Sequence, residues 1–375
     1  MISLASYRDC SGCGACLASC QSGAITLNED RYGFLYPHID PTLCVECGAC
    51  RGVCPAIQTP IFTPPLRAFA CYRSNHQERL GSTSGGLATS IALAIIKLGG
   101  VVYGSRFSPP FRVVHTRCTT PEEVLELRGS KYVQSDMRDI LPQIRHDLKQ
   151  NKRVLFIGTP CQVAGVKALC KGSVGVLYTV DILCHGVPSL KLLTETLPKG
   201  LATQQIKEMQ FRDGSKYIFR ITNYDGSHYE RDLSKDIFMK GFFNGVTTRP
   251  SCSVCRYAQE RRVSDLTIGD FWGLRSTTIT DYENGVSLAL VNNTKGEELM
   301  RICESDITKE ERPTNEAIRG NRPLNRPLQH NTRTLVFRIL YPTLGYVPAL
   351  WISLPDKMST MYAKDLLSNL KRTKR

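Results

Sequence analysis

The segment CSGCGACLASC at residues 10–20 and the segment CVECGACRGVC at residues 44–54 decide the architecture of the start of this chain. Both have the spacing Cys-x2-Cys-x2-Cys-x3-Cys, so a four-cysteine run is duplicated. Two residues between cysteines let the backbone curl around one face of an iron–sulfur cube, whereas the fourth cysteine lies one helical turn further on. The two runs therefore predict two [4Fe–4S] clusters of the bacterial ferredoxin type.

The ligand sets of these two clusters are expected to cross. In two-cluster ferredoxins the fourth cysteine of each run binds the cluster of the other run. The predicted sets are Cys10, Cys13, Cys16 and Cys54 for one cluster, and Cys44, Cys47, Cys50 and Cys20 for the other. Gln21 stands where a proline usually follows the fourth cysteine, and this change removes no ligand. Zinc also binds Cys-x-x-Cys pairs, but two matched runs of four favour iron–sulfur clusters.

Length and composition describe an ordinary globular chain apart from its cysteines. With 375 residues, 42% hydrophobic and 22% charged, two or three domains are expected. Sixteen cysteines are unusual. A disulfide framework is typical of short secreted chains, and no apolar leader precedes the first run. Reduced thiolates that bind metal in a cytoplasmic protein are therefore predicted.

The net charge of +14 predicts a basic surface, even though three dianionic clusters would lower it to about +8. Such a surface suits an acidic protein donor, a phosphorylated substrate or an anionic membrane. Nucleic acid is not expected, because no helix-turn-helix or aromatic-basic pattern occurs. Residues 335–354 are apolar but are interrupted by Arg338, Pro342 and Pro348, and a basic tail follows. They are interpreted as a core element or as a peripheral contact with the inner face of a membrane.

Beyond a proline-rich connector at residues 55–65, apolar strands alternate with helices. The expected strands cover residues 68–72, 101–107, 153–157 and 176–183, and the expected helices cover residues 84–98, 140–150 and 161–170, with a further helix after residue 188. Residues 206–233 resemble hairpins with turns at Asp213-Gly214 and Asp225-Gly226. The predicted fold is a small bacterial-type ferredoxin domain followed by a mixed α/β (α+β) domain with an antiparallel insertion.

Four cysteines of this second part stand out by their placement. Cys161 and Cys184 each follow a predicted buried strand, and Cys252 and Cys255 form another Cys-x-x-Cys. Alone, such a pair is compatible with zinc, a redox dithiol or no function. The remaining cysteines are expected to be small core residues. These are Cys71, Cys118, Cys170 and Cys303.

Several short motifs in this order carry a resemblance to a known family. They are Ser84-Gly85-Gly86, Arg128-Gly129-Ser130-Lys131-Tyr132, Gly158-Thr159-Pro160-Cys161-Gln162, Cys184-His185-Gly186, Cys252-x-x-Cys255 and the run from Asp265 to Gly273 that reads DLTIGDFWG. The set resembles the family of coenzyme F420 hydrogenase/dehydrogenase beta subunits, which also includes plant-type hydroxymethyl-chlorophyll reductases. The resemblance covers about residues 1 to 300.

The resemblance implies FAD and a third [4Fe–4S] cluster. Its ligands would be Cys161, Cys184, Cys252 and Cys255, a complete set for a cube. A structural Zn(Cys)4 site remains an alternative, because zinc accepts the same four ligands. A second alternative is a free Cys161 nucleophile beside His185, since cysteine–histidine pairs can act in that way.

Contacts to the flavin are predicted from two motifs and one threonine. The expected set is Ser84, Gly85, Gly86, Arg128, Ser130, Lys131, Tyr132 and Thr159. Bare amides at a helix start and two cations suit the FAD phosphates, and an aromatic ring can stack on the flavin. The alternative is a tight turn with a solvated charge pair.

Three further residues are weighed as parts of a reaction site. His185 is the candidate proton donor, against the alternative of a hydrogen-bonded core histidine. Asp270 and Trp272 follow an apolar strand, where they would either line a substrate cleft or form a salt-bridged and packed pair.

The expected domains are residues 1–58 for the ferredoxin part, 59–66 for the linker, 67–310 for the flavin and cluster part, and 311–375 for an extension of open role. The leading hypothesis is an oxidoreductase that passes electrons between a ferredoxin-like carrier or partner oxidoreductase and an organic two-electron substrate. Coenzyme F420 or a molecule of polysaccharide synthesis is a candidate substrate. The alternative is a non-catalytic electron-transfer subunit that feeds a partner enzyme.

Overall fold

An eight-stranded mixed sheet forms the centre of the computed structural model, which describes residues 3–212, 218–275, 278–279, 281 and 284–372. Its strands lie in the order β13-β3-β12-β11-β7-β6-β4-β5. They are β3 (Arg67–Arg73), β4 (Val101–Ser108), β5 (Arg112–Cys118), β6 (Val154–Gly158), β7 (Leu177–Ile182), β11 (Leu266–Asp270), β12 (Ser287–Val291) and β13 (Ile307–Arg312). The neighbours β4, β6, β7 and β11 are parallel, so their carboxyl ends share one edge, where α/β sheets bind ligands.

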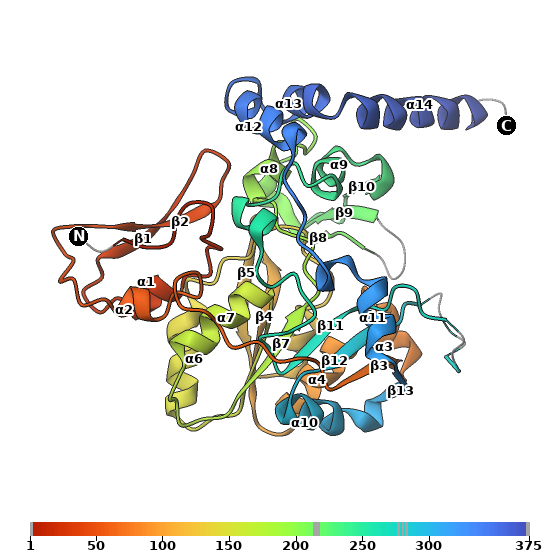
Figure 1. Cartoon of the computed structure of the whole chain (residues 1–375). Coiled ribbons are helices and arrows are strands. Elements are labelled where there is room, and N and C mark those ends of the chain that lie inside the picture. Colours follow the sequence, from red (N-terminus) through yellow and green to blue (C-terminus); the bar gives the residue numbers. More distant parts are fainter. Residues whose placement is uncertain (1–2, 213–217, 276–277, 280, 282–283, 373–375) are drawn as a thin grey trace.

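Helices cover both faces of this sheet (Figure 1). The long ones are α4 (Leu87–Lys97), α6 (Ile140–Lys149), α7 (Pro160–Leu169) and α10 (Thr294–Ile302), and the short ones are α3 (His76–Leu80), α5 (Pro121–Leu125) and α11 (Thr314–Gly320). Ile91 of α4 and Leu299 of α10 pack on one face, and Ile144 of α6 and Val163 of α7 pack on the other. The central strand β6 is therefore buried on both faces, as its continuous apolar run requires.

The N-terminal part is a small module with paired elements, drawn in red in Figure 1. Its elements are α1 (Ala15–Ser19), β1 (Ile25–Glu29), β2 (Leu35–Ile39) and α2 (Ala49–Gly52). The antiparallel pair β1–β2 aligns Ile25 with Ile39. Gly14 and Gly48 precede the two short helices, both with φ of 76°, a left-handed conformation that glycine adopts without steric cost. The duplicated sequence thus gives a duplicated backbone.

A second core is formed by the insertion and the C-terminal helices. A three-stranded antiparallel sheet consists of β8 (Ile206–Gln210), β9 (Ile218–Asn223) and β10 (His228–Asp232). The helices are α8 (Leu190–Thr194), α9 (Ile237–Phe243), α12 (Thr332–Leu344), α13 (Tyr346–Ser353) and α14 (Pro355–Arg372). Short 3-10 turns are η1 (Thr203–Gln205), η2 (Leu233–Lys235), η3 (Pro250–Val254), η4 (Glu304–Asp306) and η5 (Arg322–Leu324). Phe238 and Phe337 meet Tyr32 of the module in this core.

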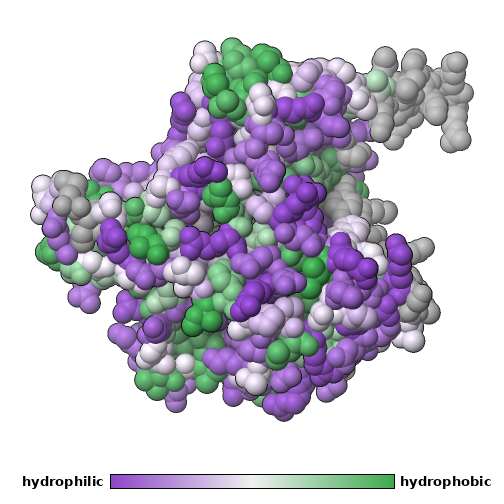
Figure 2. All heavy atoms as spheres, viewed as in Figure 1, coloured by the Kyte–Doolittle hydropathy of each residue, from purple (hydrophilic) through white to green (hydrophobic). Residues whose placement is uncertain are grey.

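The outer side of the C-terminal helices carries apolar side chains. Leu335 and Ile339 of α12 and Ile352 of α13 are more than half exposed. Figure 2 shows this apolar surface at the top of the molecule, above the second core. No helix among the described residues is both long and apolar enough to cross a membrane.

The predicted mixed α/β class with an antiparallel insertion is confirmed, with local differences. The helix expected from residue 84 begins at Leu87, because Gly86 has φ of 83°. The turn at Asp225-Gly226 joins β9 to β10, whereas the one at Asp213-Gly214 lies outside the described residues. The four cysteines expected in the core are buried. The boundary expected after residue 310 falls inside β13.

Candidate functional site

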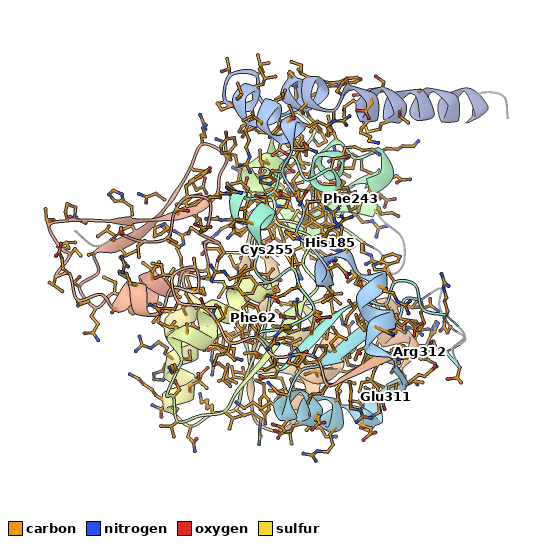
Figure 3. The ribbon with its side chains drawn as sticks, viewed as in Figure 1. Phe62, His185, Phe243, Cys255, Glu311 and Arg312 are labelled. Atoms are coloured by element: carbon orange, nitrogen blue, oxygen red, sulfur yellow. The ribbon has the colours of Figure 1, made fainter. Side chains whose placement is uncertain are left out.

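Four cysteines from three places in the body line one pocket. Cys161 lies in the first turn of α7, directly after β6, and Cys184 follows β7 at the same edge of the sheet. Cys252 lies in η3 and Cys255 ends it. All four line the same pocket, together with His185. Figure 3 shows Cys255 and His185 close together at the centre of the molecule, between the module and the sheet.

Burial dominates the electrostatics of these thiols. It raises the pKa of Cys252 to about 12 and that of Cys255 to about 11, and it raises the pKa values of Cys161 and Cys184 as well. Each thiolate would further repel the others. Four thiolates are therefore stable here only with a bound cation, and metal binding supplies that charge.

Four cysteine sulfurs are a complete donor set both for a zinc ion and for an iron–sulfur cube. The four cysteines line one pocket, and a cube of four irons needs more space between its ligands than a single zinc ion does. The donor set and the pocket both fit the predicted third cluster.

The cysteines of the module lie near one another. Burial, and then thiolates at Cys10, Cys54 and Cys50, raise the pKa of Cys16, so cysteines of the second run lie near the first run. Cys50 is affected in the same way by Cys20 and Cys47. The chain thus brings together members of each predicted set, and their ligation of iron stays a prediction.

The module is docked against the helix that carries Cys161. Cys13 is buried in the same apolar cluster as α7, and a Cβ added to Gly165 would lie 2.9 Å from its Sγ. The absence of a side chain at Gly165 therefore lets the two parts approach closely. Charge at Cys161 also raises the pKa of Cys13, which shows that the two thiols are near each other.

Arg249 is a residue at this junction that sequence reasoning missed. Its side chain is fully buried, and its Nε donates to the carbonyl of Cys10 at 2.8 Å. Its Nη2 donates to the carbonyl of Leu35 at 2.8 Å and lies 3.8 Å from the Sγ of Cys10. Its Nη1 donates to Gln134 Oε1 at 3.0 Å. The only signal in the sequence was its place before Pro250 and Cys252.

A chain of hydrogen bonds supports Cys161 from behind. Thr159 Oγ1 lies 3.2 Å from the Cys161 Sγ and donates to Gln162 Oε1 at 3.0 Å. Gln162 Nε2 donates to Ser135 Oγ at 3.0 Å, which in turn lies 2.9 Å from His115 Nδ1. Thr159, predicted to contact flavin, lines the pocket and also belongs to this network.

The predicted flavin residues lie in two adjoining groups. Ser130 Oγ is 3.2 Å from Thr83 Oγ1, which joins the motif around Lys131 to the start of α4. A Cβ added to Gly85 would lie 2.4 Å from the carbonyl oxygen of Cys71, so that glycine is required for packing. The Ser84 Oγ donates to the carbonyl of Val286 at 3.3 Å.

Buried donors near the start of α4 fit an anionic group. Arg73 Nε, Arg128 Nε and Ser82 Oγ are buried and have no hydrogen-bond partner among the described residues. Burial and the charge of Arg73 lower the pKa of Arg128. Arg73 also forms an ion pair with Glu78, so the remaining charge near the partly buried Arg128 and the unsatisfied donors are what a phosphate group would bind.

Lys131 and Tyr132 make other contacts. Lys131 Nζ donates to the carbonyls of Leu127 at 2.8 Å and Arg128 at 2.6 Å, and burial lowers its pKa to about 7. Tyr132 meets Phe242 with ring centroids 5.6 Å apart. Phe242 lines the cysteine pocket, so Tyr132 lies behind its wall.

His185, Asp270 and Trp272 are placed differently from one another. His185 lines the pocket, and burial and the charge of Arg322 lower its pKa. Asp270 forms an ion pair with Arg212 at 2.9 Å, as in the salt-bridged alternative. Trp272 is 47% exposed, so it is not part of a packed core pair.

Two family models match separate parts of the chain, one in the N-terminal module and one in the body. Residues 9–57 match the model of the 4Fe-4S dicluster domain, and residues 151–316 match that of the C terminus of the coenzyme F420 hydrogenase/dehydrogenase beta subunit. The second match covers less than half of the chain, so residues 151–316 are similar to the C-terminal part of coenzyme F420 hydrogenase/dehydrogenase beta subunits. The resemblance predicted from the motifs is confirmed. Iron–sulfur clusters in the N-terminal module are supported by that match and by a ferredoxin-like protein of Rhizobium leguminosarum, 39% identical over 13% of this chain and 80% of its own length.

Longer relatives of this chain are more distant. The relative named as the F subunit of the F420H2 dehydrogenase of Methanosarcina mazei is 21% identical over 56% of this chain, which spans 64% of that relative's length. An uncharacterized protein of Methanocaldococcus jannaschii is 22% identical over 82% of this chain and 91% of its own. A chain from the F420-reducing [NiFe] hydrogenase complex of Methanosarcina barkeri aligns over 71% of this chain and 92% of its own, with 18% identity and a TM-score of 0.48.

Proposed function

We propose that this chain is an iron–sulfur flavoprotein oxidoreductase that exchanges electrons with a one-electron protein carrier and reacts with an organic two-electron substrate. The observation that carries the proposal is the single pocket lined by Cys161, Cys184, Cys252 and Cys255. Ser11 and Pro55 of the ferredoxin module line the same pocket. The module therefore ends at the wall of the candidate reaction site.

In this proposal the four body cysteines hold a third [4Fe–4S] cluster, and Cys13 and Cys161 bring it next to the first cluster of the module. Iron–sulfur clusters supply single-electron transfer. Arg249 holds the backbone of Cys10 in place at this junction and faces its sulfur. Cys20 and the exposed Cys47 belong to the second cluster, which would receive electrons at the surface.

FAD is the proposed second cofactor. It supplies the conversion between single electrons and a two-electron transfer. The guanidiniums of Arg73, which also pairs with Glu78, and of the partly buried Arg128 would bind its phosphates near the start of α4. Thr159 at the pocket wall would position its other end, and the ring of Tyr132 would support that wall from behind Phe242. His185 would deliver a proton to the reacting atoms in the pocket.

Cofactor analysis of anaerobically purified protein tests this proposal. About twelve irons per chain and bound flavin are expected, and Cys161→Ser should lower the iron to about eight. The matched control is Cys170→Ser, at the other end of α7, which removes a buried core thiol and should leave the iron unchanged. Eight irons in the unaltered chain, or zinc at the body cysteines, would contradict the third cluster.

A non-catalytic electron-transfer subunit is the second candidate, because the Methanosarcina mazei relative is named as a subunit of a dehydrogenase. Reoxidation separates the two functions. Dithionite-reduced protein should be reoxidised by an organic substrate such as coenzyme F420 or a sugar-linked compound. Reoxidation by protein carriers alone would favour the second candidate.

A further inference from the structure

Residues 321–328, called here the roof segment, close one side of the cysteine pocket. The residues of this segment that line the pocket are Arg322, Pro323, Arg326, Pro327 and Leu328. The segment follows residue 316, where the match to the family of beta subunits ends. This part of the chain therefore adds its own side chains to the pocket.

The roof segment is fixed at both ends. Leu324 is 1% exposed and packs with Phe271 and Leu288 against the large sheet. Asn321 Nδ2 donates to the carbonyl of Ala317 at 3.0 Å. At the other end, a Cβ added to Gly245 would lie 2.9 Å from Leu328. A segment anchored in this way holds its backbone in place at the edge of the pocket.

Arg322 and Arg326 share one side of the roof segment. The N–H of Arg326 donates to the carbonyl of Arg322 at 3.1 Å, so one helical turn separates them and their side chains project from the same face. Both residues are exposed, and both line the pocket. Neither guanidinium has a hydrogen bond or an ion pair with another residue of the described chain.

The other two arginines of the pocket are already engaged. Arg262 is buried and forms an ion pair with Asp181 at 3.0 Å, and Arg256 Nη1 donates to the carbonyl of Pro55 at 3.0 Å. Asp9 is the only acidic residue among the described residues that line the pocket, and it accepts a hydrogen bond from Ser6 Oγ at 2.6 Å. The free positive charge therefore lies on the roof segment.

An apolar wall lies in the same pocket. Phe242 and Phe243 at the end of α9 have ring centroids 5.5 Å apart, and Phe243 is 56% exposed. Figure 3 shows Phe243 above His185, on the pocket side of the second core. A ligand with an anionic end and an apolar or aromatic body would match both sets of side chains.

We propose that Arg322 and Arg326 bind the phosphate group of an organic substrate, whose apolar part lies against the adjacent phenylalanines. Paired guanidiniums suit phosphate because each presents parallel N–H donors to two of its oxygens. This inference rests on the proposed function, because it names the substrate class of the same pocket. It also gives the C-terminal extension a role in substrate selection.

The test is calorimetric titration of inorganic pyrophosphate into anaerobically purified full-length protein. The double variant Arg322→Ala/Arg326→Ala should bind it about tenfold more weakly or worse, which corresponds to about 1.4 kcal/mol. The corresponding double lysine variant should keep part of the affinity, since it keeps charge but loses the paired donors. Arg319→Ala on α11, outside the pocket, is the matched control and should bind as the unaltered protein does.

Three results would overturn the inference. They are no binding of pyrophosphate to the unaltered protein, equal binding by the double alanine variant, and equally tight binding of succinate, a dicarboxylate without phosphorus. Binding lost only in Arg128→Ala would assign the phosphate to the proposed flavin site instead and would also overturn it. Iron and flavin contents are measured in the same samples, so normal contents without phosphate binding reject this inference alone. Abnormal contents reject the proposed function.

Discussion

His115 is a buried histidine whose neighbours determine its protonation. Its Nε2 lies 3.1 Å from the carbonyl oxygen of Ile157, which can only accept, so this nitrogen carries the proton. Its Nδ1 then accepts from the hydroxyl of Ser135 at 2.9 Å. Burial lowers the pKa of His115 to about 4, so the residue is neutral in the folded chain at pH 7.

A loss of stability in mild acid follows from this histidine. Between pH 6.5 and 4 the unfolded chain binds a proton at His115 and the folded chain does not, so the free energy of unfolding falls as the pH falls. The free energy of unfolding should fall by about 3 kcal/mol in total, because each unit by which the pKa is lowered corresponds to about 1.36 kcal/mol. Urea unfolding at several pH values measures it.

Substitution of the histidine tests this prediction, and a second buried histidine with a lowered pKa provides an independent comparison. His115→Gln should flatten part of the pH dependence while keeping a neutral side chain. His330 also has its pKa lowered by burial to about 4, so His330→Gln should remove another part. An unchanged pH dependence in His115→Gln would show that this residue is already protonated, or not buried, in the folded protein.

At the scale of elements, helix α4 begins and ends at glycines that serve different purposes. Gly85 has strands β3 and β12 beside it, and an added Cβ would lie 2.4 Å from the carbonyl oxygen of Cys71 and 2.6 Å from the amide nitrogen of Ser287. Gly99, after the other end, has φ of 71° and nothing within 4 Å of an added Cβ. The first glycine is required for space and the second for backbone conformation.

Alanine at these two positions should therefore have different effects. Gly85→Ala should lower the free energy of unfolding by about 3 kcal/mol, because backbone atoms of two strands must move. Gly99→Ala should cost about 1 kcal/mol, since only the left-handed conformation opposes it. Urea unfolding measures both losses, provided that the dependence of the free energy of unfolding on urea concentration is the same in the two variants. Equal losses in the two variants would show that the strands near Gly85 can adjust.

The elements that sequence patterns predicted in the body agree with the structure apart from local differences, whereas β5, β12, β13 and α10 were not predicted. The strand after residue 153 and the helix after residue 160 were predicted within one residue, because a continuous apolar run and a Gly-Thr-Pro turn separate them. The start of α4 was misplaced, since serines at residues 82 and 84 look like helix caps, yet the left-handed Gly86 delays the helix. Helix caps alone do not reveal a preceding turn.

The whole molecule has a buried cation between its two cysteine-rich parts. Arg249 is withdrawn from water, and its hydrogen bonds within the described chain go to uncharged oxygens, so its burial costs free energy. Those three carbonyl or amide oxygens compensate in part, and the rings of Tyr36 and Phe34 lie under its guanidinium. A thiolate at Cys10 would supply negative charge beside it.

Replacing this arginine should affect both stability and redox potential. Arg249→Met should lower the free energy of unfolding by about 3 kcal/mol, because it leaves buried carbonyl groups unpaired. It should also make the potential of the cluster nearest Cys10 more negative, since a nearby cation favours the reduced state. Potentiometric titration followed by electron paramagnetic resonance measures the shift.

Arg301→Met on α10, an exposed arginine away from the cysteine-rich parts, is the matched control and should leave that potential unchanged. A folded Arg249→Met protein with an unaltered potential would show that this arginine serves docking alone. The sequence could not predict its role, because contacts between residues 10 and 249 depend on how the module sits on the sheet. The two N-terminal cysteine runs could be recognised because their spacing is local, whereas the grouping of Cys161 and Cys184 with Cys252 and Cys255 was expected only from the family resemblance.

The position of the roof segment in the sequence determines when the pocket is covered during synthesis. A ribosome adds residues in order, and residues 321–328 come after every cysteine of the chain. Domains fold as they emerge, beginning with the N-terminal one. The cysteine pocket is therefore open on one side during synthesis and is covered last. Proteins that insert clusters would reach its cysteines before the roof segment is in place.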